Sequence, residues 1–465
     1  MVSIATQKTG QQYLIPSMSS TPSPNQCLLP LTARVNEQDH LEVGECDVVE
    51  LVEQFGSPLY VVDEATLRAG CQQYRQAFEQ YYPGESLVLY ASKAWNCLAI
   101  CAIVASEGLG IDIVSGGELF TALEAQVDPK TIYFHGNNKS VEELKLAIDT
   151  SADITIVVDN WHELRLLSQL AEGNTTPIRI MLRITPGIEC HTHEYIQTGH
   201  LDSKFGFDPD QLEQVFATVK QSSVLTCVGL HAHIGSQIFE LQPHYDLADV
   251  MVRWLIKAKE YGLPICELDI GGGLGMKYTE QDDPPSIDEW VKQVCEAVLT
   301  ACKTHNLPLP KLLAEPGRSV IGPTCITAYT VGSQKVIPDM RTYITVDGGM
   351  SDNPRPITYQ SLYRALIANK MSQPIQEQPV TLAGKHCESG DIVIKDAHLP
   401  ETTSGDIVTV LGTGAYNYSM ASNYNRIPRP AAVLVADGDA SVIIRRETYC
   451  DLIRHDQMPS YLLSK

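Results

Sequence analysis

The sequence has little of what marks a membrane, secreted or nucleic-acid-binding protein. None of its apolar runs reaches the ~18 residues that a membrane-spanning helix needs. Its 13 cysteines are odd in number and scattered, with no Cys-x-x-Cys pair, which argues against a disulfide framework and favours a reducing compartment. Basic residues are scarce, since 34 Lys and Arg stand against 56 Asp and Glu, a formal net charge of −22. We therefore expect neither a nucleic-acid partner nor a membrane partner.

Residues 1–30 contain no acidic side chain, and Lys8 is their only basic residue. They are rich in Ser, Thr, Pro and Gln, and they lack the charged and apolar regions of a secretory signal. This composition predicts a disordered tail. A plastid transit peptide would also be poor in acid and rich in Ser, but it should carry more Arg, so we expect a cytoplasmic protein.

The chain does have length and a regular alternation of strand-like and helix-like segments. With 465 residues, 44% of them apolar, it can form two domains with a sizeable core. The strand-like runs are 59–63, 87–93, 111–115, 132–136, 154–160, 178–184, 225–234, 265–271 and 312–318. Strands that alternate with helices indicate a parallel sheet, and eight such repeats close a barrel of about 250 residues. Nine runs are one too many, so we assign the first to another domain.

The pattern changes after residue 318, where short apolar runs separated by Gly, Pro and Asp predict strands with few helices. Residues 31–58 carry a strand-like stretch and a short helix that can join those strands. We therefore expect an α/β protein with a (β/α)8 TIM-like barrel over residues 64–318. A second, all-β domain would be discontinuous, formed from residues 31–63 and 319–465.

Polar side chains collect at one end of the predicted barrel strands. These residues are Lys93, Ser115, His135, Arg183, His231, His233, Glu315 and Arg318, and the glycines 271–273 end a further strand. Because chemistry in such barrels takes place at the carboxyl ends of the strands, we expect the active site there. A lysine that ends an apolar strand, as Lys93 does, is either a surface residue or a Schiff-base lysine with a depressed pKa.

Paired imidazoles make zinc an alternative. His231-x-His233 puts two rings on one face of a strand, and His191-x-His193 could do the same. A ring that stacks on an aromatic group, or a purely structural histidine, is the commoner outcome for such a motif. We therefore expect no metal.

Two further motifs have more than one interpretation. Gly271-Gly-Gly follows a strand and would suit a phosphate, yet it lacks the Gly-x-Gly-x-x-Gly spacing of a dinucleotide site and could be a tight turn. Glu315 and Arg318 would suit a protonated pyridine nitrogen and a phosphate, or they form an ordinary salt-bridged turn.

Together, the motifs resemble those of the fold-type III pyridoxal-phosphate decarboxylases, and within that family the enzymes that act on meso-2,6-diaminopimelate. The resemblance covers roughly residues 50–450. The motifs, in the family's order, are Tyr90-Ala-Ser-Lys-Ala, His231-Ala-His-Ile-Gly-Ser-Gln, Gly271-Gly-Gly, Glu315-Pro-Gly-Arg, Asp347-Gly-Gly-Met, Cys387-Glu-Ser-Gly-Asp and Gly414-Ala-Tyr. Trp95 stands where a smaller aromatic residue is usual.

The resemblance implies pyridoxal 5'-phosphate as the cofactor. Lys93 would hold it as a Schiff base, His233 would stack on the pyridine ring, and Glu315 would pair with the ring nitrogen. Asp112 and His135 match polar positions near the cofactor. The residues expected around the phosphate are Gly235, Ser236, Gly273, Gly317, Arg318 and Tyr416.

The resemblance also implies how the substrate is held. Arg318, Arg355 and Tyr359 would bind its distal carboxylate end, with Tyr416 nearby, and Glu388 would bind its distal ammonium group. Cys387 would reach in from a second subunit as a proton donor, with Lys93 as the other candidate. The active site would then require a homodimer.

These residues imply decarboxylation of meso-2,6-diaminopimelate to L-lysine and CO2, the last step of lysine biosynthesis. Sibling decarboxylases of ornithine, arginine or carboxynorspermidine recognise a distal cation with acidic residues, so Arg355 would not help them. A pyridoxal-phosphate-binding regulator without turnover is a further alternative, disfavoured by Cys387 and Tyr416. A racemase would need a two-base arrangement.

Overall fold

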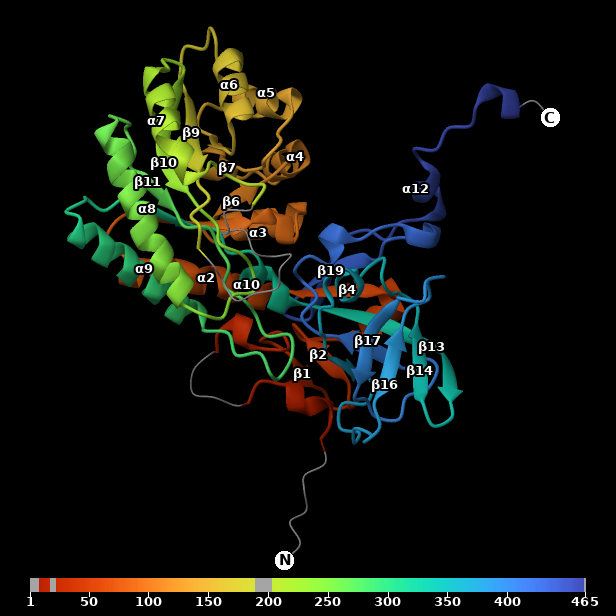
Figure 1. The fold of residues 1–465 in the computed structure, drawn as a ribbon. Helices are drawn as coiled ribbons and strands as arrows, with labels where there is room; N and C mark the ends of the chain where they lie inside the picture. Colours follow the sequence, from red (N-terminus) through yellow and green to blue (C-terminus); the bar gives the residue numbers. More distant parts are fainter. Residues whose placement is uncertain (1–7, 17–21, 189–202, 464–465) are drawn as a thin grey trace, which may run out of the picture. The chain divides into compact units, whose positions relative to one another are not determined.

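The structure, a computed structural model, describes residues 8–16, 22–188 and 203–463. The chain divides into two compact units, which Figure 1 colours along the sequence. The β unit comprises residues 1–16, 28–65 and 324–465, and the barrel unit comprises residues 17–27 and 66–323. The sequence placed the boundaries at 63/64 and 318/319, a few residues earlier in both cases.

Eight parallel strands close the barrel, as expected. They are β5 (Ser86–Ala91), β6 (Gly110–Ile113), β7 (Ile132–Phe134), β8 (Thr155–Val158), β9 (Ile178–Arg183), β10 (Leu225–His231), β11 (Glu267–Asp269) and β12 (Lys311–Ala314). Each pairs with the next in sequence, and β12 pairs with β5. The strands appear in the sequence as nearly continuous apolar runs because both of their faces are buried, one inside the barrel and one under helices.

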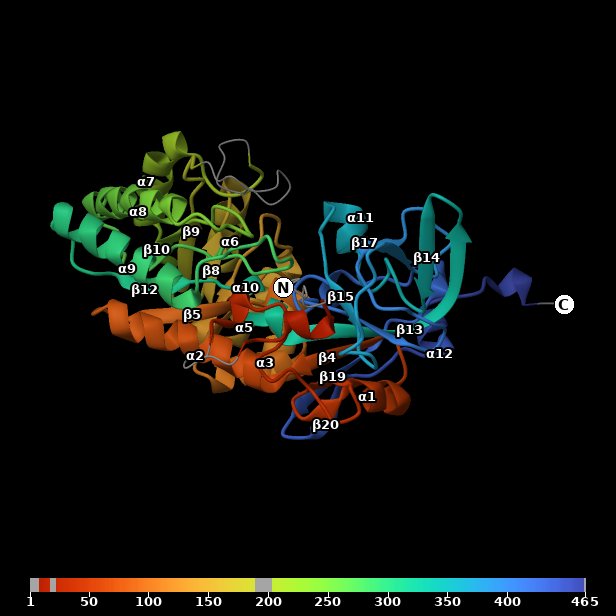
Figure 2. The same ribbon diagram turned by 90° about the horizontal axis from the view of Figure 1, so that it is seen from below.

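Helices cover the outside of these strands, and α8 and α9 lie side by side there (Figure 2). The helical elements are α2 (Glu64–Tyr81), η3 (Ser92–Ala94), α3 (Leu98–Ser106), α4 (Gly116–Glu124), α5 (Val141–Thr150), α6 (Trp161–Leu170), α7 (Leu212–Gln221), α8 (Gln242–Glu260), α9 (Ile287–Thr304) and α10 (Arg318–Ile321). Capping boxes start two of them: Ser140 with Glu143 at α5, and Ser286 with Glu289 at α9. Each box satisfies two backbone N–H groups that the first turn leaves unpaired.

A layer of large side chains fills the barrel interior. Leu89, Tyr133, Val157, Met181 and Leu313 pack against one another, and none is more than 1% exposed. The barrel is therefore a packed core and not a channel, which leaves the ends of the strands as the place for chemistry.

The β unit contains two sheets. The smaller consists of β1 (Arg34–Val35), β2 (Leu41–Val43) and β3 (Cys46–Asp47), followed by α1 (Val48–Phe55). The larger has nine strands: β4 (Leu59–Asp63), β13 (Cys325–Ile337), β14 (Arg341–Val346), β15 (Ala365–Ile367), β16 (Val380–Ala383), β17 (Ile392–Ala397), β18 (Ile407–Val410), β19 (Ala431–Ala436) and β20 (Asp439–Ile444). Two short helices, α11 (Arg355–Tyr359) and α12 (Tyr449–Ile453), complete the unit.

Strand β4 lies in the larger sheet, where it pairs antiparallel with β13 and parallel with β19. The expectation that residues 59–63 lie outside the barrel is thus confirmed. All five residues of β4 are buried, which explains why this strand resembled a barrel strand in the sequence. The chain leaves the sheet after β4, forms the whole barrel, and returns as β13 beside the strand it left.

The expected disordered tail at residues 1–30 is wrong for the part that the structure describes. Tyr13 is buried in the core of the β unit, and residues 24–26 form a short 3₁₀ helix, η2 (Pro24–Gln26). Asn25 is fully buried in the barrel unit. The polar composition misled because a few apolar side chains, such as Tyr13, and hydrogen bonds from Asn25 to distant backbone are enough to order this segment.

Within the described residues, no helix combines the length and apolar character needed to cross a membrane. His191 and His193 lie outside the described residues, so their part of the zinc alternative has no structural test.

Candidate active site

Lys93 lies in η3, just beyond the carboxyl end of β5, and faces the neighbouring strand β6. Its Nζ is 3.6 Å from Oδ2 of Asp112, whose side chain is 1% exposed, whereas the Lys93 side chain is 41% exposed. Burial raises the pKa of Asp112, against the opposing effects of His135 and Lys93. The pair joins a buried carboxyl group to an amine that solvent can reach, as an amine that must react with an aldehyde has to be.

Glu315 follows β12 and contacts imidazoles from two other strand ends. Its Oε1 is 2.6 Å from Nε2 of His135, and its Oε2 is 3.2 Å from Nε2 of His231. Burial alone would raise the pKa of Glu315, but the two imidazoles outweigh it and hold the pKa well below its usual value. Burial lowers the pKa of His231 to about 3, so this neutral ring stabilises the carboxylate as an N–H donor and not as a cation.

Asp269 ends β11 beside Glu315, and its Oδ1 accepts a hydrogen bond from the Gly271 N–H at 2.8 Å. Burial, and then the charge of Glu315, raise the pKa of Asp269 well above its usual value. Two carboxyl groups this close do not both ionise. We conclude that Glu315 is the ionised member of the pair and Asp269 the protonated one.

His233 follows His231, the last residue of β10, by two positions and is only partly buried. Its Nδ1 accepts a hydrogen bond from the Gly272 N–H at 3.2 Å. Burial, followed by the nearby cations Lys93 and Arg183, lowers the pKa of His233 well below its usual value. The ring is therefore neutral and fixed by the glycine turn, as a ring that stacks on a cofactor should be.

The glycine turn forms a cradle that has no room for side chains. Gly273 has φ +123°, and a Cβ there would come within 3.1 Å of the Gly235 carbonyl oxygen and 3.2 Å of Cε1 of His244. A Cβ on Gly272 would collide with the carbonyl oxygen of Glu315. Because no Cβ stands at these positions, a ligand group can come close to the backbone, which is what a phosphate requires.

Arg318 begins α10, directly after Gly317, and spans two loops beside the cradle. Its Nε and Nη2 donate to Oγ of Ser236 at 3.1 and 3.0 Å, and its Nη1 donates to the Tyr278 hydroxyl at 2.7 Å. Its guanidinium group is thus fixed in one orientation. Four of the expected barrel residues, Gly235, Ser236, Gly273 and Arg318, belong to one set of neighbouring loops.

In the β unit, three of the expected substrate residues come together. The guanidinium carbon of Arg355 lies 5.1 Å from the ring centre of Tyr359 and 5.6 Å from that of Tyr416. Arg355 is buried to 6% exposure at the start of α11, and Tyr416 adopts a left-handed backbone (φ +62°). A buried guanidinium beside aromatic rings is suited to hold a carboxylate.

Cys387 and Glu388 lie on an exposed loop between β16 and β17. The Cys387 N–H donates to Oδ1 of Asn425 at 2.9 Å, and the preceding His386 is buried with its Nδ1 2.8 Å from Oδ2 of Asp391. The loop is thus anchored at its base, while both Cys387 and Glu388 are exposed.

Comparison with known proteins identifies the family. A family model described as "Pyridoxal-dependent decarboxylase, pyridoxal binding domain" matches residues 64–322. Diaminopimelate decarboxylase from Synechocystis sp. is 62% identical over 454 residues, which are 96% of either chain. The chain belongs to the diaminopimelate decarboxylase family. The Bacillus subtilis diaminopimelate decarboxylase is 45% identical and covers 91% of this chain and 97% of its own.

Solved diaminopimelate decarboxylase structures share the fold. The Helicobacter pylori enzyme complexed with L-lysine matches at a TM-score of 0.80 and 31% identity, over 87% of this chain and 98% of that one. The M. jannaschii enzyme in complex with L-lysine matches at a TM-score of 0.85 and 31% identity. The match covers 95% of this chain and 100% of that one. The chain is accordingly a carboxy-lyase whose cofactor is pyridoxal 5'-phosphate.

The barrel unit fits the cofactor of the diaminopimelate decarboxylases. Lys93 offers a reachable amine, and the ionised Glu315 is the buried anion that a protonated pyridine nitrogen needs. The cradle at Gly273, which a Cβ would fill, would suit the phosphate.

Two residues of this site were missed by the sequence analysis. Asp269 forms the carboxyl pair with Glu315, and Tyr278 fixes Arg318. A carboxylate at the end of the apolar strand β11 was a signal for the first. Tyr278 lies in a loop without any motif, so nothing marked it.

A metal at these strand ends stays an unfavoured alternative for this diaminopimelate decarboxylase family member. Among the described residues, the ligand atoms of His135, His231, Asp269 and Glu315 lie within 4.8 Å of one another. His233, which the zinc motif paired with His231, is not in this group. An ion there would take the carboxylate that the cofactor's ring nitrogen needs, so we keep our prediction of no metal.

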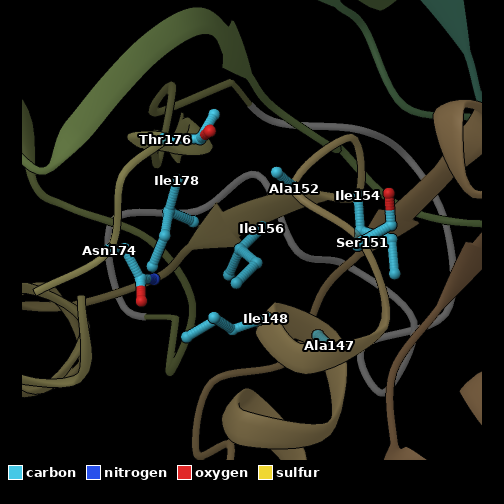
Figure 3. A pocket seen from close by; sticks show the side chains of 9 residues that line it. All are labelled: Ala147, Ile148, Ser151, Ala152, Ile154, Ile156, Asn174, Thr176 and Ile178. Atoms are coloured by element: carbon cyan, nitrogen blue, oxygen red, sulfur yellow. The ribbon is translucent and has the colours of Figure 1, made fainter.

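A separate pocket lies at the opposite end of the barrel strands (Figure 3). Its volume is about 30 Å³, and Ile148, Ile156 and Ile178 contribute to its apolar lining. It has room for little more than water, so it is not a site for an amino acid or for the cofactor.

Proposed function

We propose that this chain converts meso-2,6-diaminopimelate to L-lysine and CO2, and that Arg355 recognises the carboxylate that the reaction leaves in place. The observation that carries the proposal is the buried Arg355 between Tyr359 and Tyr416. A substrate with a second carboxylate needs a cationic partner, whereas ornithine or arginine would meet a repelling charge. Tyr359 and Tyr416 complete the proposed carboxylate end in the β unit, and Glu388 would take the distal ammonium group.

The barrel residues provide for the carbon–carbon cleavage. When bound, pyridoxal phosphate accepts the electron pair that the departing CO2 leaves behind. Lys93 would hold it through its solvent-reachable amine. Glu315, ionised and fixed by two imidazoles, keeps a proton on the pyridine nitrogen. His233 supports one face of the ring, and Gly235, Ser236, Gly273, Gly317 and Arg318 surround the phosphate.

After CO2 leaves, a proton must be delivered to the substrate Cα. We propose that Cys387 donates it from a second copy of the chain, with Lys93 as the alternative donor. Support comes from the exposed position of Cys387 on an anchored loop. Exposed apolar side chains near the C-terminus, among them Tyr449, Ile453 and Tyr461, favour self-association as well. The proposed assembly is a homodimer with a shared active site.

We place the protein in the cytoplasm, with neither a nucleic-acid nor a membrane partner. The support is chemical: each of the twelve cysteines within the described residues is free, and nine of them are buried, as suits a reducing compartment. A plastid location stays the alternative.

The decisive experiment is CO2 release by the purified full-length protein with pyridoxal phosphate and, in separate tubes, meso-diaminopimelate, ornithine or arginine. We expect release from diaminopimelate alone, with lysine as product. Release from another amino acid moves the chain to a sibling substrate class. No release from any of them, with a normal cofactor spectrum, favours the regulator alternative.

Arg355→Ala tests the observation behind the proposal. Loss of one charge-assisted carboxylate contact should lower kcat/KM for diaminopimelate by about 10- to 100-fold. Arg341→Ala is the matched control, because Arg341 lies on β14 and bonds to Thr381 instead. Equal kcat/KM in the two variants would contradict the role of Arg355.

A further inference from the structure

Residues 22–27 run across the barrel unit as a strap, and Asn25 is its centre. The Asn25 side chain is 0% exposed, and its Nδ2 donates to the carbonyl oxygens of Gly275 at 3.0 Å and Pro285 at 2.9 Å. The main-chain carbonyl oxygen of Asn25 accepts a hydrogen bond from the Lys277 N–H at 2.8 Å. A single side chain therefore ties together the two ends of the loop 275–285.

Neighbouring strap residues strengthen this closure. Gln26 Nε2 donates to the Pro284 carbonyl oxygen at 3.0 Å. The Ser23 hydroxyl donates to Oδ1 of Asn25 at 2.8 Å and accepts from the N–H of Ile287, the first residue of α9, at 3.0 Å. The amide of Asn25 is thus oriented, with its oxygen toward Ser23 and its nitrogen toward the loop.

The loop that the strap closes carries Tyr278, whose hydroxyl accepts from Nη1 of Arg318. The strap also packs, through η2, beside α10, the short helix that starts at Arg318. It therefore touches both elements that determine where Arg318 points: the helix that bears it and the loop that receives its hydrogen bond. The other two nitrogens of this guanidinium lie on Ser236 beside the glycine cradle.

We propose that the strap is a positioning element of the cofactor site, acting through Tyr278 on Arg318. Without Asn25, two loop carbonyl groups lose their buried donor and the loop ends separate, so Tyr278 no longer directs the guanidinium toward the cradle. The inference rests on the proposed role of Arg318 at the cofactor phosphate. It also means that an active form of this chain keeps residues 22–27, whatever happens to the residues before them.

The test is the affinity of the full-length apoprotein for pyridoxal phosphate, followed by the visible absorption of the bound cofactor. We expect Asn25→Ala to weaken binding by about tenfold, in the usual range for coupling between two sites. Gln11→Ala is the matched control: it removes an N-terminal side-chain hydrogen bond of the β unit, to Ser372, and should leave the affinity unchanged. A structural role alone would lower the melting temperature of the apoprotein without changing the affinity, and that result would overturn the proposal.

A double-mutant cycle tests the route. If the strap acts through Tyr278, then Asn25→Ala combined with Tyr278→Phe should weaken binding no more than the stronger of the single changes. Fully additive effects would overturn the route through Tyr278.

Should Asn25→Ala fail to fold, Gln26→Ala removes one bond at the edge of the same loop and should weaken binding by a smaller factor. Unchanged affinity of the Gln26→Ala protein would overturn the role of the strap. A wild-type chain that binds the cofactor but releases no CO2 would contradict the proposed function and leave this comparison of affinities intact.

Discussion

In the barrel unit Glu315 is buried in contact with two imidazoles, whereas Cys387 and Glu388 of the β unit are exposed on a loop. The charge of Glu315 is set within one chain, by two imidazoles and a protonated neighbour. The loop has no such surroundings. The difference teaches that the charge of a buried carboxylate can be set within a single barrel, whereas the proposed proton donor Cys387 lies exposed and, on our proposal, is covered only by a second copy of the chain.

Lys93→Ala should abolish the chemistry that we assign to the barrel unit. Without the amine, nothing attaches the cofactor covalently and nothing displaces the product from it. Decarboxylation should therefore fall by about 10⁴-fold or more. CO2 release measures this. Lys130→Ala, which changes an exposed lysine of the same unit, should retain full activity. An active Lys93→Ala protein with bound cofactor would contradict the assignment.

Glu315→Gln and Asp269→Asn separate the two members of the carboxyl pair. The first removes the ionised group and should lower kcat by about 10²- to 10³-fold. The second replaces a carboxyl that is already neutral, because burial and Glu315 raise the pKa of Asp269, so it should change kcat less than about tenfold. Equal losses in the two variants would show that the charge is shared and not localised on Glu315.

Cys387→Ala tests the exposed loop of the β unit. We expect kcat to fall by about 10²-fold, as for loss of a general acid, with unchanged thermal stability because the thiol is exposed. Mixing this variant with Lys93→Ala under subunit exchange should restore part of the activity, since one site of a mixed dimer would keep both residues. Failure of all mixtures, with exchange demonstrated, would mean that each chain supplies its own Cys387.

The smallest effect concerns Asp352, a buried carboxyl of the β unit whose partners are the Tyr329 hydroxyl and the Gly349 N–H. Here burial outweighs these bonds and raises the pKa to about 7. A raised pKa means that the protonated form is favoured in the fold, so stability should be highest below pH ~4 on account of this group and decline as pH rises toward 7. Asp352→Asn should flatten that decline in urea unfolding series at several pH values. An unchanged slope would show that Asp352 is ionised in the fold.

Much of the fold could be predicted because barrel strands, buried on both faces, appear as apolar runs. Counting them even placed residues 59–63 in the other sheet. The carboxyl ends of the strands indicated Lys93, His135 and Glu315, but the proximity of Arg355 to Tyr416 came only through family resemblance, because no periodicity links residues so far apart.

The strap could not be predicted for the opposite reason. Asn25 gains its order from carbonyl groups some 250 positions away, and a Ser-, Pro- and Gln-rich segment gives no local sign of such partners. Asp269 did carry a local signal, but its protonation depends on Glu315, which only the folded barrel brings beside it.

The pairing of β4 with β13 also bears on how the protein is made. During synthesis β4 leaves the ribosome before any barrel strand, and its neighbours β13 and β19 follow only after the whole barrel has emerged. A largely apolar strand must therefore wait without its β-sheet partners until the barrel segment has been synthesised, which exposes it to wrong partners. The larger sheet, which neighbours the proposed substrate residue Arg355 along the chain, can therefore be completed only after the whole barrel has been synthesised.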